Sequence, residues 1–163
     1  MTKLNLLLSL LITLTLSSCL KNKNSASCPY SSPTAVATAQ EITNIQNYLT
    51  QQSLTATQHS SGIFYNITTA GTGESVSSQC NTVGVRYVGK LTTGSQFDAS
   101  TNPVQFPLYN LISGWRIGIP LTKVGGSIKL YIPPSLGYGS QAQQGIPANS
   151  ILVFDIDLVT ITK

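Results

Sequence analysis

The sequence predicts an α+β protein: a domain of several strands with one short helix among them, preceded by a helical extension. Hydrophobic and polar residues alternate with a period of two over 83–91, 127–132 and 152–158, which is typical of half-buried strands. Helical signals are limited to 38–51 and a short segment, 111–117. A chain of 163 residues suits one such domain with extensions.

The first 18 residues have the pattern of a signal peptide. Lys3 supplies a positive charge, and 4–16 is an apolar segment shorter than the ~20 residues of a membrane span. It ends in Leu-Ser-Ser before Cys19, which resembles a bacterial lipobox. We expect lipidation of Cys19 and an anchor of two or more acyl chains, which holds stably. The alternative is an ordinary signal peptide in which Cys19 is incidental.

The residues after Cys19 are small, polar and proline-containing, which predicts a flexible tether over 19–37. Leu20 follows the lipobox in place of the aspartate that signals inner-membrane retention in enteric bacteria. By that resemblance we expect the cell envelope, and the outer membrane within it. The sequence leaves open whether the domain faces the periplasm or the outside of the cell.

With Cys19 lipidated, Cys28 and Cys80 are the two remaining thiols in an oxidising compartment. A disulfide between them is one hypothesis, and two free thiols are the other. The lone His59 lies in a polar connector and no CxxC pair occurs, so we expect no metal site.

An amphipathic helix is predicted from Thr38 to Gln51, followed by a connector to residue 61. Thr38 and Glu41 have capping-box spacing, and Ile42, Ile45 and Leu49 lie on one stripe. We expect this helix to dock on the domain or on a partner chain.

The main domain is predicted over 62–163. Its strands alternate inward and outward residues, with Lys129 and Tyr131 expected to point outward. Asn110 is expected to cap the helix of 111–117. The stretch 132–158 combines proline turns, an aromatic-bearing loop and a buried strand, which suggests the lip of a pocket.

Eight short motifs together resemble the FKBP family of peptidyl-prolyl cis-trans isomerases, in the right order and spacing over about 62–163. They are Val85-Arg86-Tyr87-Val88-Gly89, Phe97-Asp98, Gly114-Trp115, Val124-Gly125-Gly126, Ile132-Pro133-Pro134, Leu136-Gly137-Tyr138-Gly139, Gly145-Ile146-Pro147 and Leu152-Val153-Phe154-Asp155. The resemblance implies a twisted antiparallel sheet wrapped across the short helix, with a ligand pocket between them. It implies proline-containing polypeptides as substrates and a tacrolimus-class macrolide as inhibitor.

The resemblance also assigns roles to residues of the pocket. Trp115 would be its floor, under a stacked proline ring, and Tyr87, Phe97 and Phe154 would be aromatic walls. Asp98 would polarise the edge of the site.

Contacts at the rim follow from the same resemblance. Ile112 would offer its backbone N–H to a substrate carbonyl, and Leu111 would line the edge beside it. Tyr138 would donate its hydroxyl, and Ile146 would cap the rim. Val104 takes a position where the family often has phenylalanine, and we expect it to contact the substrate as well.

Such a site suits rotation about an X–Pro bond, because that reaction needs no nucleophile. The one histidine and five acids are scattered, so no catalytic triad or carboxylate pair is expected, and no cofactor is called for. The net charge of +4 is spread without any run of three basic residues, which argues against nucleic acid as a partner. A non-catalytic module that holds proline-containing peptides, or a chaperone, is the alternative to an isomerase.

Overall fold

The computed structural model describes residues 27–163, and the signal peptide over 1–18 and Cys19 lie outside this range. Helices are α1 (Ala39–Gln51) and α2 (Ser113–Gly118), with single 3₁₀ turns η1 (Leu108–Asn110), η2 (Ile119–Leu121) and η3 (Pro134–Leu136). Strands are β1 (Thr57–Gln58), β2 (Phe64–Thr69), β3 (Thr82–Leu91), β4 (Gln96–Pro107), β5 (Gly126–Ile132) and β6 (Leu152–Thr162). In this part of the chain no helix is long and apolar enough to span a bilayer.

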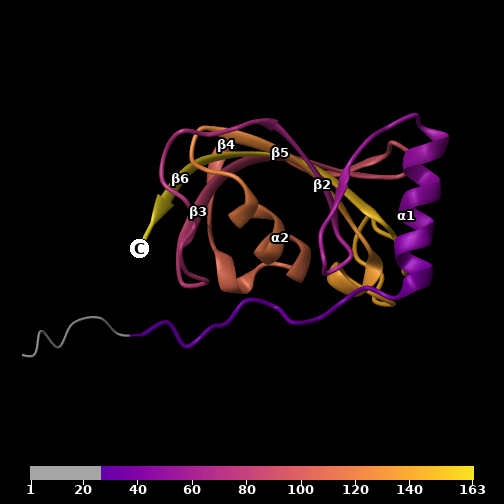
Figure 1. Cartoon of the computed structure of the whole chain (residues 1–163), viewed down its shortest axis with the longest axis horizontal. Coiled ribbons are helices and arrows are strands. Elements are labelled where there is room, and N and C mark those ends of the chain that lie inside the picture. The colour runs from indigo at the N-terminus through magenta and orange to yellow at the C-terminus, as the bar shows by residue number, and fades with distance from the viewer. Residues whose placement is uncertain (1–26) are drawn as a thin grey trace, which may run out of the picture.

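The six strands form one sheet in the order β1-β2-β5-β6-β3-β4, and every neighbouring pair is antiparallel. The sheet curves around α2, which lies in its concave side (Figure 1). The predicted fold class is thereby confirmed. The edge strand β1 lies inside the connector predicted between the helix of 38–51 and residue 62, so the sheet begins earlier than residue 62.

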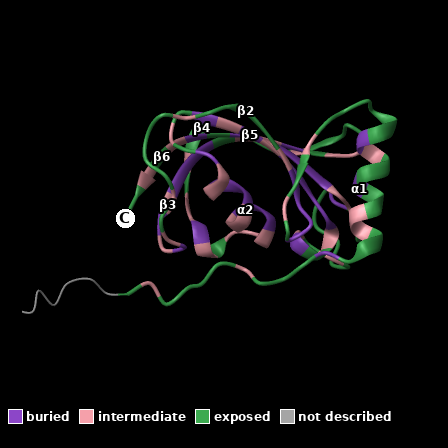
Figure 2. Ribbon diagram, in the orientation of Figure 1, coloured by how far each residue is buried: buried purple, intermediate pink, exposed green. Residues whose placement is uncertain are grey.

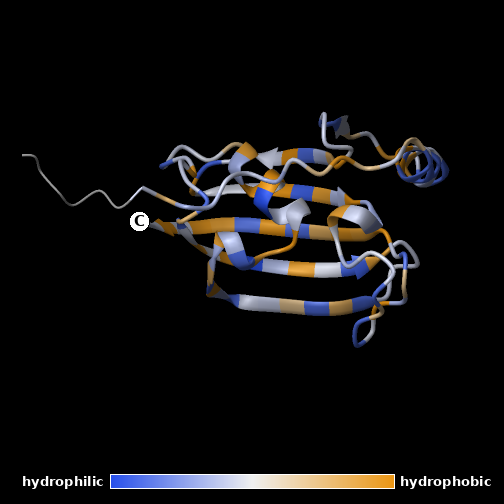
Figure 3. Cartoon of the chain, turned by 90° about the horizontal axis from the view of Figure 1, so that it is seen from below, coloured by the Kyte–Doolittle hydropathy of each residue, from blue (hydrophilic) through white to orange (hydrophobic). Residues whose placement is uncertain are grey.

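The concave face carries the main core. Alternation along β3, β5 and β6 directs one set of side chains toward α2, as the banding of hydropathy along the strands shows (Figure 3). Leu130, Ile156 and Leu158 on this face are at most 2% exposed. Burial is concentrated where these strands face α2 (Figure 2). The pocket therefore stands on a rigid support.

Helix α1 covers part of the convex face. Ile45 and Leu49 of α1 pack with Phe64, Tyr131 and Val153 of three adjacent strands. Tyr131 does point to the convex face as predicted, but it is only 2% exposed because α1 lies over it. The predicted docking of the helix onto the domain is thus what the structure shows.

The start of α1 is fixed by the predicted capping box. Thr38 Oγ1 accepts from the Glu41 backbone N–H, and the Glu41 carboxylate accepts from the Thr38 N–H at 2.8 Å. The same carboxylate reaches across to η3, where Oε1 accepts from Ser135 N–H at 2.8 Å and Oε2 from Ser135 Oγ at 2.9 Å. Glu41 therefore ties α1 to the start of the loop that follows β5.

Residues 27–38, the N-terminal strap, lie extended along the outer side of α2 (Figure 1). The strap includes the described part of the predicted tether 19–37. Cys28 forms a disulfide with Cys80, 52 positions away in the sequence. Arg116 Nη2 on α2 donates to the Ser31 carbonyl at 2.7 Å. Polar, small residues could not fold alone, but here the domain supplies the contacts.

Helix α2 begins two residues later than predicted. Asn110 belongs to η1, and Leu111 and Ile112 are extended, with ψ of 162° and 150°. Ile112, not Asn110, occupies the N-cap position, without a side-chain cap. The 3₁₀ turn at 108–110 takes up the predicted cap Asn110, and the extended Leu111 and Ile112 that follow delay the start of the helix.

Candidate active site

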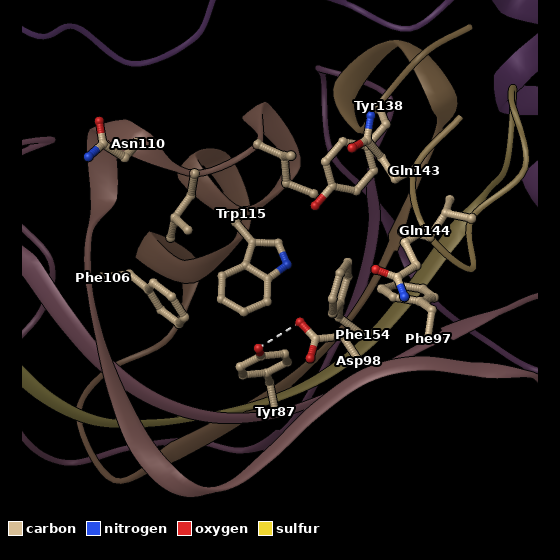
Figure 4. A pocket seen from close by; sticks show the side chains of 13 residues that line it. Tyr87, Phe97, Asp98, Phe106, Asn110, Trp115, Tyr138, Gln143, Gln144 and Phe154 are labelled. Atoms are coloured by element: carbon tan, nitrogen blue, oxygen red, sulfur yellow. Dashed lines mark hydrogen bonds between the residues drawn. The ribbon is translucent and has the colours of Figure 1, made fainter. Parts of the chain in front are cut away.

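A cavity of about 450 Å³ opens between the concave face of the sheet, α2 and the loop between β5 and β6. Its lining is mainly aromatic and aliphatic, and Asp98 is its single charged side chain within the described residues (Figure 4). The lining residues are Tyr87, Phe97, Asp98, Phe106, Asn110, Leu111, Ile112, Trp115, Tyr138, Gln143, Gln144, Ile146 and Phe154. This composition suits an apolar group with a few hydrogen bonds that orient it.

Trp115 forms the floor of the cavity and is 4% exposed. Its ring centroid lies 5.0 Å from that of Phe154 and 5.2 Å from that of Tyr87, with both pairs edge-to-face. Edge-to-face packing on several sides fixes the indole plane. The short helix α2 thus presents one rigid aromatic surface to the cavity.

Phe97 and Phe154 form a wall on the sheet side, with ring centroids 5.5 Å apart and planes at 86°. They come from β4 and β6, and Gly89 on the intervening β3 pairs with Phe154 and with Asp98. A Cβ on Gly89 would lie 2.7 Å from atoms of both phenyl rings. Glycine at 89 therefore makes room for the wall.

Tyr87 and Asp98 are joined by a hydrogen bond in which the Tyr87 hydroxyl donates to Oδ2 at 2.7 Å (Figure 4). Burial and then this bond raise the pKa of Tyr87 to about 12. The phenol therefore stays protonated and keeps donating to the carboxylate at neutral pH. One oxygen of Asp98 is committed to a partner within the protein.

Tyr138 stands on the loop after η3 and is 38% exposed. Partial burial, followed by the nearby Asp98 charge, raises the pKa of its hydroxyl, which remains a donor at neutral pH. The loop is held below it, because the N–H groups of Gly137 and Gly139 both donate to the Pro134 carbonyl, at 2.9 and 2.8 Å. Gly139 has a φ of +58°, a conformation that suits glycine.

A backbone donor also belongs to a lining residue, Ile112. In the part of the chain that the structure describes, no backbone or side-chain group accepts from the Ile112 N–H. This follows from its place just before α2, since the first N–H groups of a helix have no intrahelical acceptor. Leu111 lines the edge beside it.

The rim opposite α2 is a tight turn in which Gln143 and Ile146 exchange two backbone hydrogen bonds of 2.9 and 3.0 Å. Ile146 is 6% exposed and joins the main core, which anchors the turn. Gln143 and Gln144 extend their amides along the cavity edge.

The structure brings nine of the ten residues predicted from the resemblance to one cavity, and Val104 is the exception. Val104 and Phe106 lie on the same face of β4, opposite Val85 and Val83. Only the larger Phe106 ring reaches the lining, with its centroid 6.2 Å from those of both Trp115 and Tyr87. The aromatic contact expected near Val104 is thus made two residues further along the strand.

Three further lining residues, Asn110, Gln143 and Gln144, were not among the predicted site residues. Asn110 was assigned to a helix cap. The glutamines belong to the polar tip of the loop expected to form the pocket lip, and the sequence pattern does not show which residues of that tip reach the cavity.

Fold and cavity together define the class: a curved antiparallel sheet around a short helix, with an aromatic pocket floored by tryptophan. The family model for FKBP-type peptidyl-prolyl cis-trans isomerases matches residues 73–159. The chain belongs to the FKBP-type peptidyl-prolyl cis-trans isomerase family.

Several known proteins are similar to this chain. The FKBP-type peptidyl-prolyl cis-trans isomerase FkpA of Buchnera aphidicola subsp. Schizaphis graminum is 46% identical over 105 residues, which cover 63% of this chain and 42% of that protein. FK506-binding protein 4 of Chaetomium thermophilum is 50% identical over 95 residues, or 56% of this chain and 20% of that protein. The crystal structure of Escherichia coli FkpA aligns with a TM-score of 0.68 at 37% identity, covering 76% of this chain and 60% of that one.

The matched region spans 42% of the Buchnera protein, 20% of FK506-binding protein 4 and 60% of the E. coli FkpA chain, which is less than two thirds of each. The residues that the family model matches, 73–159, contain β3, β4, β5, α2 and every residue that lines the cavity.

Proposed function

We propose that the protein is a peptidyl-prolyl cis-trans isomerase that acts on exposed X–Pro bonds of exported polypeptides. The observation that carries this proposal is the cavity itself: a fixed tryptophan floor, aromatic walls and a small number of oriented hydrogen-bond donors. Membership of the isomerase family supports it.

Rotation about an X–Pro bond is slow because amide resonance must be broken, against a barrier of ~18–20 kcal/mol. No covalent intermediate is needed. The twisted amide has lost its resonance dipole, so an apolar pocket destabilises the planar ground state relative to it. Each tenfold in rate requires about 1.4 kcal/mol of such differential stabilisation.

The proposed roles follow from the geometry of the cavity. The proline ring stacks on Trp115, between the walls of Tyr87, Phe97 and Phe154. The Tyr138 hydroxyl and the Ile112 N–H hold substrate carbonyls in this scheme, because both are donors of residues that line the cavity and neither has an acceptor within the described residues. Leu111 and Ile146 exclude water at the edges.

Asp98 has a supporting role in this scheme. Its carboxylate accepts from Tyr87, which fixes its orientation at the pocket edge. An oriented negative charge there polarises the site without having to accept a proton from the substrate.

The proposed setting is the bacterial cell envelope, with a lipid anchor at Cys19 and the outer membrane as destination. The signal-peptide pattern of 1–18, the lipobox resemblance and Leu20 support this. The Cys28–Cys80 disulfide also fits an oxidising compartment. Incorporation of labelled palmitate by the wild type, but not by Cys19→Ser, tests the anchor. Equal labelling of the wild type and Cys19→Ser would exclude a lipid anchor at Cys19.

A protease-coupled isomerisation assay on a Leu-Pro peptide tests the activity. We expect acceleration by the protein, inhibition by tacrolimus and a large loss in Trp115→Ala. Tacrolimus is also called FK506, and it is chosen because a similar protein is named an FK506-binding protein. A wild type no faster than Trp115→Ala would exclude the enzyme. Tight peptide binding without acceleration would leave a non-catalytic proline-binding module.

A further inference from the structure

Gln143 and Gln144 place two primary amides on the rim of the pocket, on the side of Tyr138 and Phe97 (Figure 4). The rotation mechanism proposed above gives neither of them a role. A Cβ on the following residue, Gly145, would lie 3.6 Å from Phe97 Cβ, so the turn that carries both glutamines lies against the phenyl wall.

The turn holds these side chains at fixed starting points. Gln143 N–H donates to the Ile146 carbonyl at 2.9 Å, and Ile146 N–H donates back at 3.0 Å. Gly145 takes a φ of +76°, and Ile146 is buried in the core. A side chain on a held backbone loses less freedom when it binds a ligand than one on a mobile loop.

Both amides are free to bind a ligand. Within residues 27–163, neither side-chain amide forms a hydrogen bond to another protein group, and both residues are exposed. Each amide carries two N–H donors and a carbonyl acceptor and has no charge. Its best complement is therefore an uncharged side chain that both donates and accepts, such as that of glutamine or asparagine.

The position of the turn indicates which substrate residue it meets. In the pose proposed above the proline ring stacks on Trp115 and the Tyr138 hydroxyl holds a substrate carbonyl. With that carbonyl taken as the one of the rotating bond, the preceding residue X lies on the Tyr138 side of the cavity. Gln143 and Gln144 lie on that side of the cavity. Asp98, the charged lining residue, lies there too and would repel an acidic X.

We propose that Gln143 and Gln144 form a polar subsite that selects an uncharged hydrogen-bonding side chain, above all an amide, at the position before proline. This inference rests on the proposed function, because it takes the proline ring to bind on Trp115. It extends that function by naming the class of sequence that the rim favours.

The test compares peptides that differ only at X: glutamine, the nearly isosteric norleucine, and glutamate. The quantity compared is the ratio of kcat/KM for the Gln-Pro peptide to kcat/KM for the norleucine-Pro peptide. This ratio should be about three- to tenfold higher in the wild type than in the double variant Gln143→Met/Gln144→Met, which is the effect of one or two neutral hydrogen bonds. Methionine keeps the length and flexibility of glutamine without the amide. The ratio of the two peptides is the readout, so any change that the double variant causes in both peptides alike cancels.

Gln141→Met is the matched control, because Gln141 lies on the same loop but outside the cavity lining, and its ratio should equal that of the wild type. An unchanged ratio in the double variant would overturn the proposal, as would an equal loss on all three peptides. Independently of any variant, the side-chain amide NMR signals of Gln143 and Gln144 should shift with Gln-Pro peptide and stay in place with norleucine-Pro. Equal shifts with both peptides would count against the subsite.

The norleucine peptide separates this inference from the proposed function. If the wild type does not accelerate isomerisation of this peptide, the proposed isomerase activity is excluded. The preference for glutamine over norleucine is then measured as a ratio of peptide Kd values. Acceleration with no preference for glutamine removes the subsite alone.

Discussion

Tyr87 on β3 and Asp98 on β4 share a hydrogen bond of 2.7 Å at the edge of the pocket. The bond comes from neighbouring strands whose register brings position 98 opposite Gly89, two residues after Tyr87. It fixes the orientation of the carboxylate and keeps the phenol protonated. The two residues therefore act as one unit, and replacing either one releases the other.

The raised pKa of Tyr87 predicts how stability changes at high pH. Because folding favours the protonated phenol, its contribution to stability is full below pH 10 and is lost as pH rises through about 12. Tyr87→Phe should therefore flatten the fall in the free energy of unfolding between pH 10 and 12, measured by urea titration. An equally steep fall in the variant would contradict this assignment.

The apolar pocket should matter more for activity than its carboxylate. We expect Asp98→Ala to lose roughly tenfold or less in kcat/KM, and Phe97→Ala or the double variant Trp115→Ala/Tyr138→Phe to lose roughly a hundredfold or more, or about 2.7 kcal/mol. The reason is that the walls and floor desolvate the bond, whereas Asp98 is already held by Tyr87. The reverse order in the isomerisation assay would place the stabilisation in the carboxylate.

Gly89→Ala tests the space between the two phenyl rings. The new methyl group would meet Phe97 and Phe154 at 2.7 Å and push one of them into the cavity. We expect a loss of about 1–3 kcal/mol in stability, typical of overpacking, together with weaker peptide binding. Lys90→Ala, at the neighbouring exposed position, should change neither quantity. Full binding by Gly89→Ala would show that the wall yields without closing the pocket.

Glu41→Gln should destabilise the protein near neutral pH and not at low pH. Burial acts to raise the pKa of Glu41, but hydrogen bonds from Thr38 and Ser135 outweigh it, and the folded-state pKa is lowered. The ionised carboxylate therefore contributes stability above its unfolded pKa of 4.5, and this is lost as pH falls through the lower folded value. The expected loss at pH 7 is about 1–2 kcal/mol.

Thermal unfolding at pH 7 and pH 3 measures this effect, with Glu74→Gln at an exposed position as the control. A difference between Glu41→Gln and wild type that persists undiminished at pH 3 would rule out the ionised carboxylate as its source.

Local patterns predicted the elements well because their causes are local. Alternation defined β3, β5 and the start of β6 to within a residue, and capping-box spacing placed the start of α1. The wrapping of the sheet and nine pocket residues came from the family resemblance, because pairing between distant strands leaves little trace in a short window.

Tertiary contacts account for what the sequence could not predict. Tyr131 is buried because α1 covers it, and Glu41 reaches Ser135, 94 positions away. Phe106 reaches the pocket and Val104 does not, although both lie on one face of β4, because the strand positions them two residues apart and the phenyl ring is the longer side chain. The glutamine rim depends on how a polar turn folds back over Phe97.

With the proposed lipid anchor at Cys19, the strap would also limit how far the domain can stand from a membrane. A tether free from Cys19 to residue 37 could reach about 60 Å, at ~3.4 Å for each of 18 residues. Fastening at Cys28 leaves nine residues, or about 30 Å. Tyr30, just beyond it, stacks on Tyr109, the neighbour of the pocket residue Asn110. Anchored through Cys19, the domain would work within about one bilayer thickness of the lipid surface, with the α2 edge of its pocket nearest the anchor.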